Sequence, residues 1–89
     1  MIPHAKIYMK HFDYATQEEV ICEACGKMPA NDIHHIHGRG KGKNVIGNLM
    51  AVCRRCHDRA TTSKNYVPPD EMQIIHNYFL QGSRKTFLK

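Results

Sequence analysis

Four cysteines and a cluster of three histidines are the residues of this 89-residue chain whose types and spacing could do chemistry. The cysteines form two C-x-x-C pairs, CEAC and CRRC, and the histidines lie in the stretch DIHHIHGRG. Thiolates in such pairs bind zinc, because each tight turn presents two sulfur ligands. An imidazole can hold a metal or take up a proton near neutral pH. The pattern therefore predicts chemistry that depends on metal ions and on proton transfer.

The cysteine pairs predict a closed, structural zinc site. Its ligands would be Cys22, Cys25, Cys53 and Cys56. Four thiolates complete a tetrahedral shell, and a site without an open position is structural rather than catalytic. Buried free cysteines are one alternative, and disulfides would be another in a secreted chain. The stretch CRRCH also fits the C-x-x-C-H pattern of c-type haem attachment, but haem attachment would leave CEAC unexplained.

Length and composition predict one small domain, residues 1–89, in a reducing compartment. A chain this short buries a modest core and often needs a staple such as zinc. The stretch MIPHAKIYMKHF is polar and charged and lacks the apolar segment of a signal peptide, so we expect a cytoplasmic location. No apolar run reaches the length of a membrane span, so we expect no membrane partner. The net charge of +5 is compatible with a nucleic-acid partner.

Positive charge is concentrated between the histidine cluster and the second cysteine pair. In the stretch GRGKGK, glycines alternate with Arg39, Lys41 and Lys43. Such a loop brings backbone and basic side chains close to phosphates, so we expect these three residues to bind DNA. The alternative is a solvated loop that makes no contact with DNA. This alternative is stronger for the two lysines than for Arg39.

The elements that must position these residues follow from the apolar pattern. We expect helices over residues 5–15 and about 70–81, and a short helix in RRCHDRATT. Met72, Ile75 and Phe79 give the last long helix an apolar face. Short strands are expected in NDIHHIH and NLMAVC, with GRGKGKN as the loop between them.

The run of strand, loop, strand and helix that carries CEAC, IHHIHGRG, Asn48-Leu49 and CRRCH resembles the HNH endonuclease family. The matching residues extend from Cys22 to about Thr61. The resemblance implies a small α+β fold with a ββα-metal (His-Me finger) core, stapled by the four-cysteine zinc site and flanked by N- and C-terminal helices. It also implies a metal-dependent DNA endonuclease that hydrolyses phosphodiester bonds by nicking or by double-strand cleavage.

The resemblance assigns a role to each signature residue. His35 matches the general base, and Asn48 matches the asparagine that holds the loop and orients His35. His34 and His57 match the ligands of one catalytic divalent ion, such as Mg²⁺, Mn²⁺, Ni²⁺ or Zn²⁺. Two adjacent imidazoles make sense there, because neighbouring strand side chains diverge. One ring nitrogen cannot both hold a metal and accept a proton.

The remaining histidines have no signature role. For His37 two interpretations remain: a peripheral contact with a phosphate, or an ordinary surface histidine. His4, His11 and His76 lie outside the motif, and we expect ordinary structural or surface positions for them.

The main alternative function is a non-catalytic, zinc-ribbon-like DNA-binding module. Such a module would need zinc and basic charge but not the spaced set of His34, His35, Asn48 and His57. A redox or electron-transfer protein is disfavoured by the second cysteine pair. Small stand-alone members of the resembled family are often phage-encoded and some act beside a packaging terminase. The resemblance therefore implies a terminase or another DNA-processing protein as a partner, with the chain acting as a monomer or a homodimer.

Overall fold

The structure is a computed structural model that describes residues 3–61 and 66–82. The chain starts with helix α1 (Pro3–His11) and the 3₁₀ helix η1 (Gln17–Glu19), and then reaches strand β1 (Asp32–His35). After a loop come the 3₁₀ helix η2 (Ile46–Asn48), strand β2 (Leu49–Val52), helix α2 (Arg54–Arg59) and helix α3 (Pro69–Leu80). Every helix in the described ranges is too short or too polar to cross a membrane.

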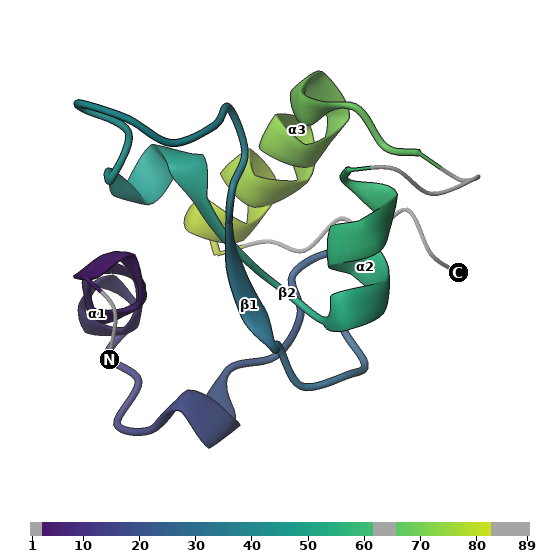
Figure 1. The fold of residues 1–89 in the computed structure, drawn as a ribbon. Coiled ribbons are helices and arrows are strands. Elements are labelled where there is room, and N and C mark those ends of the chain that lie inside the picture. The colour runs from purple at the N-terminus through teal and green to yellow at the C-terminus, as the bar shows by residue number, and fades with distance from the viewer. Residues whose placement is uncertain (1–2, 62–65, 83–89) are drawn as a thin grey trace.

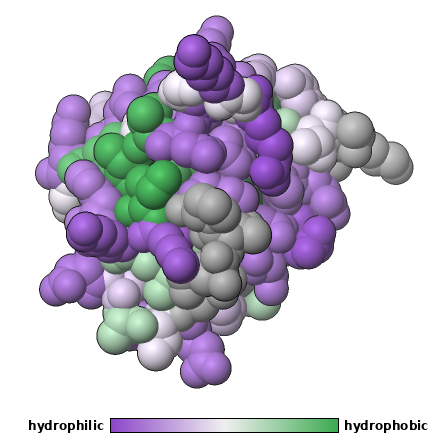
Figure 2. Space-filling model, turned by 60° about the vertical axis from the view of Figure 1, so that its left-hand side comes forward, coloured by the Kyte–Doolittle hydropathy of each residue, from purple (hydrophilic) through white to green (hydrophobic). Residues whose placement is uncertain are grey.

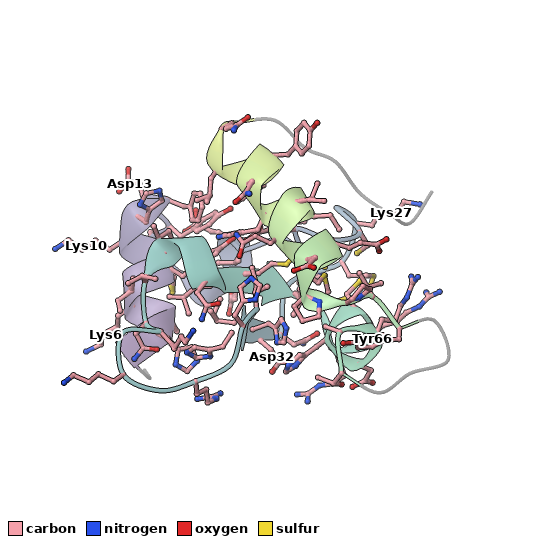
Figure 3. All side chains as sticks on the ribbon, turned by 90° about the horizontal axis from the view of Figure 1, so that it is seen from above. Lys6, Lys10, Asp13, Lys27, Asp32 and Tyr66 are labelled. Carbon is pink, nitrogen blue, oxygen red and sulfur yellow. The ribbon has the colours of Figure 1, made fainter. Side chains whose placement is uncertain are left out.

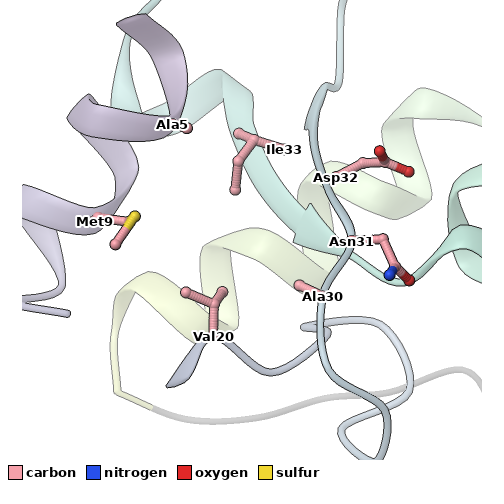
Figure 4. Close-up of a pocket in the computed structure, with 7 residues that line it drawn as sticks. All are labelled: Ala5, Met9, Val20, Ala30, Asn31, Asp32 and Ile33. Atoms are coloured by element: carbon pink, nitrogen blue, oxygen red, sulfur yellow. The ribbon is translucent and has the colours of Figure 1, made fainter. Parts of the chain in front are cut away.

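The two strands form an antiparallel hairpin at the centre of the molecule, with α1 on one side and α2 and α3 on the other (Figure 1). His34 pairs with Met50 and His35 pairs with Leu49 across the hairpin. Successive strand side chains point to opposite faces. Figure 4 shows this alternation, because Ile33 is turned toward Ala5 and Met9 of α1 while the Asp32 carboxylate points the other way. The expected small α+β fold with a ββα arrangement is confirmed.

Each face of the hairpin has its own apolar cluster. The cluster on the α1 side consists of Tyr8, Met9, Val20, Leu49 and Ala51. The cluster on the other side includes all four cysteines together with Met50, Val52, Met72 and Ile75. The cysteines therefore lie inside the core that joins the hairpin to α2 and α3.

Helix α1 ends earlier than the sequence pattern predicts. Asp13 has a φ of 59°, the left-handed conformation that terminates helices. The Tyr14 amide donates to the Met9 carbonyl at 2.9 Å and the Asp13 amide donates to the Lys10 carbonyl at 3.3 Å. These two bonds form a Schellman motif with an aspartate in the position usually held by glycine. The predicted extension of the helix to residue 15 is therefore wrong, because the periodic apolar pattern continues past the backbone turn.

A buried charge pair ties the first cysteine turn to both flanking helices. Glu23 and His76 are fully buried, and His76 Nδ1 donates to Glu23 Oε1 at 2.6 Å. His76 Nε2 donates to the Ile46 carbonyl at 2.7 Å, so both ring nitrogens carry protons and the ring is an imidazolium. Burial alone would lower the pKa of His76, but the hydrogen bond and charge of Glu23 outweigh it and raise that pKa. The Tyr8 hydroxyl and the Ala51 amide complete the partners of Glu23.

Removing this carboxylate should strongly destabilise the fold. Glu23→Leu would leave the imidazolium of His76 buried without its counter-charge, and breaking a buried pair in this way costs about 3–5 kcal/mol. We expect that loss in the free energy of unfolding, measured by urea denaturation of the zinc-loaded protein and far-UV circular dichroism. Glu18→Leu, at an exposed position of η1, is the matched control and should change the value by less than about 0.5 kcal/mol. Equal stability of the two variants would contradict a stabilising role for the pair.

Candidate active site

The four cysteines converge on one point. Their Sγ atoms all lie within 4.8 Å of one another, and all four residues are buried. A tetrahedral zinc with Zn–S bonds of about 2.3 Å needs sulfur separations of about 3.8 Å, so the cluster fits a zinc ion with only a small contraction. No other group of three or more potential ligands was found among residues 3–61 and 66–82. The predicted four-cysteine arrangement is thereby confirmed.

The local backbone explains why each pair can present two sulfurs. In the first pair, the Cys25 amide donates to Cys22 Sγ at 3.5 Å, and Gly26 takes a φ of 69° that closes the turn. In the second pair, Cys53 precedes α2 and Cys56 lies in its first turn. A hydrogen bond with the Cys56 side chain lowers the pKa of the Cys22 thiol to about 4, which favours the thiolate that metals bind. Because Cys53 and Cys56 are buried with the first pair, the geometry favours zinc over haem attachment.

A second group of side chains lies on the hairpin face that carries α2. The His34 and His57 rings are 4.9 Å apart between centroids. His57 Nδ1 donates to Asp32 Oδ2 at 3.0 Å, which leaves its Nε2 with a lone pair. A carboxylate that fixes the orientation of an imidazole in this way is a common partner of metal-binding histidines. His34 and His57 can therefore offer two nitrogen ligands to one ion beside Asp32.

The surroundings of His34 keep its imidazole neutral. Burial, followed by the nearby charge of His57, lowers the pKa of His34 to about 4. A neutral imidazole has a free lone pair at pH 7, so His34 is in the form that a metal ion requires. The charge of Arg39 also contributes to this shift, which places its guanidinium near the histidine group.

His35 faces the opposite side of the hairpin, toward α1. Its ring packs against the His4 ring at a centroid distance of 4.6 Å, and His35 is only 7% exposed. His35 Nε2 donates to Asn44 Oδ1 at 2.7 Å. The other ring nitrogen, Nδ1, is buried and has no hydrogen-bond partner. Buried polar atoms without a partner are rare and often mark functional positions, so this nitrogen is a candidate proton acceptor.

Asn48 holds the basic loop, and its three side-chain hydrogen bonds go to loop backbone groups rather than to the His35 ring. Its Oδ1 accepts from the His37 amide at 2.8 Å, and its Nδ2 donates to the carbonyls of Gly38 and Lys43 at 3.2 and 2.9 Å. These bonds tie together the two ends of the loop after β1. We expected Asn48 to form a hydrogen bond with the His35 ring. In the structure, Asn44 forms that bond. His37 Nε2 donates to Gln73 Oε1 at 3.0 Å, which links the loop to α3.

The loop itself presents its charges to solvent. Arg39, Lys41 and Lys43 are exposed, and the intervening glycines have positive φ values. In Figures 1 and 3 the loop lies on the same side of the molecule as α1, from which Lys6 projects outward. Figure 2 brings that side forward and shows a mainly hydrophilic surface around one hydrophobic area. The loop is therefore accessible to a polyanion such as DNA.

A hollow beside β1 is separate from the histidines. A hollow lies between α1 and residues 30–33, but its lining is mostly apolar and includes none of the histidines (Figure 4). Asp32 borders this hollow, while its carboxylate is engaged with His57 on the other face.

Comparison with known proteins identifies the central segment. The family model described as HNH endonuclease matches residues 22–63. Residues 22–63 are therefore similar to the HNH endonuclease family. Members of the family are generally nucleases that act on DNA. Comparisons with curated proteins and with solved structures found no match.

The sequence analysis did not predict the contacts of three residues around the HNH signature. Asp32 precedes His34 by two positions, and the period of a strand could have placed both on one face. Asn44 contacts His35 across the loop, and no sequence pattern predicts that contact. His4 lies outside the matched segment and has a buried structural position, as the sequence analysis allows, but no sequence pattern indicates that its ring packs against His35.

Proposed function

We propose that the protein is a metal-dependent DNA endonuclease that hydrolyses phosphodiester bonds with His35 as general base. The observation that carries this proposal is the pairing of two arrangements at the end of β1. On one face, the His34 and His57 rings lie 4.9 Å apart between centroids, and the Asp32 carboxylate orients His57. On the other face, His35 holds a nitrogen with no partner. Both arrangements fall inside the HNH segment.

The protein's own groups would divide the reaction between them. His35 Nδ1 takes a proton from the water whose oxygen attacks phosphorus, while Nε2 stays bonded to Asn44. The P–O bond to the leaving oxygen breaks as the new bond forms. Because Nδ1 is buried, water reaches it only when the packing around the ring, which includes His4, opens.

His34 and His57 would hold the catalytic divalent ion. Their nitrogens suit ions such as Mn²⁺, Ni²⁺ or Zn²⁺, and Mg²⁺ is the alternative with more oxygen ligands. When bound, such an ion polarises a phosphate oxygen and stabilises the leaving oxygen. Asp32 keeps His57 in the tautomer whose Nε2 is free, and Arg54 Nη2 lies 3.4 Å from the second carboxylate oxygen of Asp32. Two imidazole ligands leave coordination positions for phosphate and water.

A plasmid-cleavage assay tests the proposal. The zinc-loaded protein is incubated with supercoiled plasmid and with Mg²⁺, Mn²⁺, Ni²⁺ or additional Zn²⁺ in separate reactions. We expect nicked or linear product with at least one ion, and product formation that stops when a weak chelator removes the added ion. Circular dichroism in parallel verifies that the chelator leaves the fold intact. An intact plasmid with every ion would overturn the nuclease proposal.

DNA binding should depend steeply on salt through the loop after β1. Each phosphate neutralised by a cation contributes a slope of roughly −0.9 to the plot of log affinity against log salt concentration. We expect Arg39→Gln to make that slope shallower by about 0.9. Lys27→Gln is the matched control, because Lys27 is exposed on the opposite side of the molecule from Lys6 (Figure 3). Fluorescence anisotropy over a salt series measures both, and equal slopes for the two variants would remove Arg39 from the DNA contact.

A further inference from the structure

The His35 ring is restrained from two sides by residues outside the H-N-H signature. The side-chain oxygen of Asn44, in the loop, lies 2.7 Å from His35 Nε2. His4, in α1, packs against the ring at 4.6 Å with an angle of 64° between the ring planes. Rotating the imidazole by half a turn would break the bond to Asn44 and disturb the packing against His4. The ring orientation observed is therefore held by specific contacts.

The contact with Asn44 also decides which nitrogen carries the proton. An amide oxygen only accepts hydrogen bonds, so His35 Nε2 must be the donor. In the neutral ring Nδ1 is then unprotonated. The opposite tautomer would place an N–H at Nδ1, which is buried and has no acceptor. Buried N–H groups without an acceptor are especially rare, so the environment disfavours that tautomer.

We infer that Asn44 is a positioning residue that holds His35 in the Nε2–H tautomer and thereby makes Nδ1 the basic nitrogen. Asn44 is itself exposed, so this role does not depend on a place in the core. The inference deepens the proposed function, on which its kinetic consequence rests. Its consequence for the tautomer is a property of the folded protein and stands whether or not DNA is cut.

Two substitutions separate the hydrogen bond from the bulk of the side chain. Asn44→Leu keeps the branched shape and removes the acceptor, while Asn44→Asp keeps an oxygen at the same position. Asn77→Leu is the matched control, because Asn77 is an exposed asparagine on α3 whose side-chain oxygen accepts from Gln73. All three changes fall at exposed positions, so each variant should fold.

The direct readout is the imidazole ¹⁵N spectrum of the ¹⁵N-labelled, zinc-loaded protein, with His35 assigned from the signals that disappear in His35→Gln. A long-range ¹H–¹⁵N correlation separates protonated from unprotonated ring nitrogens. We expect an Nε2–H ring in wild type, in Asn44→Asp and in Asn77→Leu, and a mixture of tautomers in Asn44→Leu. An Nδ1–H ring in wild type, or an unchanged His35 pattern in Asn44→Leu, would overturn the inference.

The second readout is the rate of plasmid cleavage. Asn44→Leu should lower kcat about ten- to a hundred-fold with KM unchanged, a loss like that caused by removing the partner that orients a metal-binding imidazole. Asn44→Asp should recover most of that loss, and Asn77→Leu should match wild type. Cleavage by Asn44→Leu at the wild-type rate would overturn the positioning role. If wild type cuts nothing, the proposed function fails, and the ¹⁵N spectra still decide the inference about the tautomer.

Discussion

Cys25→Ser is expected to leave the protein without a cooperative thermal unfolding transition. The substitution replaces one sulfur of the four-cysteine cluster with a shorter, harder oxygen ligand that zinc binds poorly in such a site. Structural zinc contributes about 10–16 kcal/mol in small zinc-binding peptides, whereas a whole domain is stable by only about 5–15 kcal/mol. Losing the ion therefore removes as much free energy as the fold has.

The position of the cluster in the core makes this effect larger. The four cysteines belong to the same apolar cluster as Met50, Val52, Met72 and Ile75, which joins the hairpin to α3. Without the ion, four thiolates at these positions would repel one another. Neutral thiols would avoid that repulsion, but they would lack the stabilisation that bonds to a metal provide. The helix–hairpin contact and the site consequently form or fail together.

Thermal melting by far-UV circular dichroism measures the transition, and elemental analysis measures bound zinc in the same samples. A strong chelator added to wild type should reproduce the behaviour of Cys25→Ser. Met28→Ser is the control for the turn, because Met28 is 57% exposed and follows the first cysteine pair. Wild-type melting of Cys25→Ser without zinc would show that the cysteines do not hold a structural metal.

The spacing of cysteines and histidines predicted the framework of the molecule well. Two C-x-x-C pairs can supply four thiolates to one ion only if the pairs lie together. Their convergence could therefore be expected before the fold was known. The strands around His34 and Leu49 followed from short apolar runs between turn residues. The end of α1 did not, because Asp13 adopts a left-handed conformation that sequence periodicity does not report.

The finer organisation around His35 depends on contacts that sequence cannot supply. Asn44 lies in the loop and Asn48 four positions later at the end of η2, and from the sequence either could face the ring. The loop conformation, with positive φ at Gly38, Gly40 and Gly42, turns Asn48 to the backbone and Asn44 to His35. His4 reaches the ring from a helix far away in the sequence, so only the packing of α1 on the hairpin reveals it.

His35→Ala is expected to cut plasmid DNA about 10²- to 10⁴-fold more slowly than wild type, the usual cost of losing a general base. The ring contacts neither the cysteine cluster nor the His34–His57 pair in the bonds observed, so both metal sites should remain. The variant should therefore retain zinc, fold, and bind DNA about as tightly as wild type. Because His35 is buried, His35→Gln serves as a second variant that fills more of the space.

His57→Ala should fail in a different way. It removes one of the two imidazoles proposed to hold the divalent ion and leaves Asp32 without its partner on α2. We expect weaker binding of Mn²⁺ or Ni²⁺ in isothermal titration calorimetry as well as slower cutting, whereas His35→Ala should slow cutting with ion binding unchanged. His11→Ala, at an exposed position of α1, is the control and should match wild type in both measurements.

A nicking time course at saturating divalent ion, with metal content measured in parallel, distinguishes the possible outcomes. Slow cutting by His35→Ala with normal ion binding assigns proton transfer to His35, because a lost metal site would change both quantities. Cutting at the wild-type rate would show that another group is the base. If wild type binds DNA and zinc but cuts with no ion, the non-catalytic DNA-binding module becomes the better account, since only catalysis requires both imidazole arrangements at the end of β1.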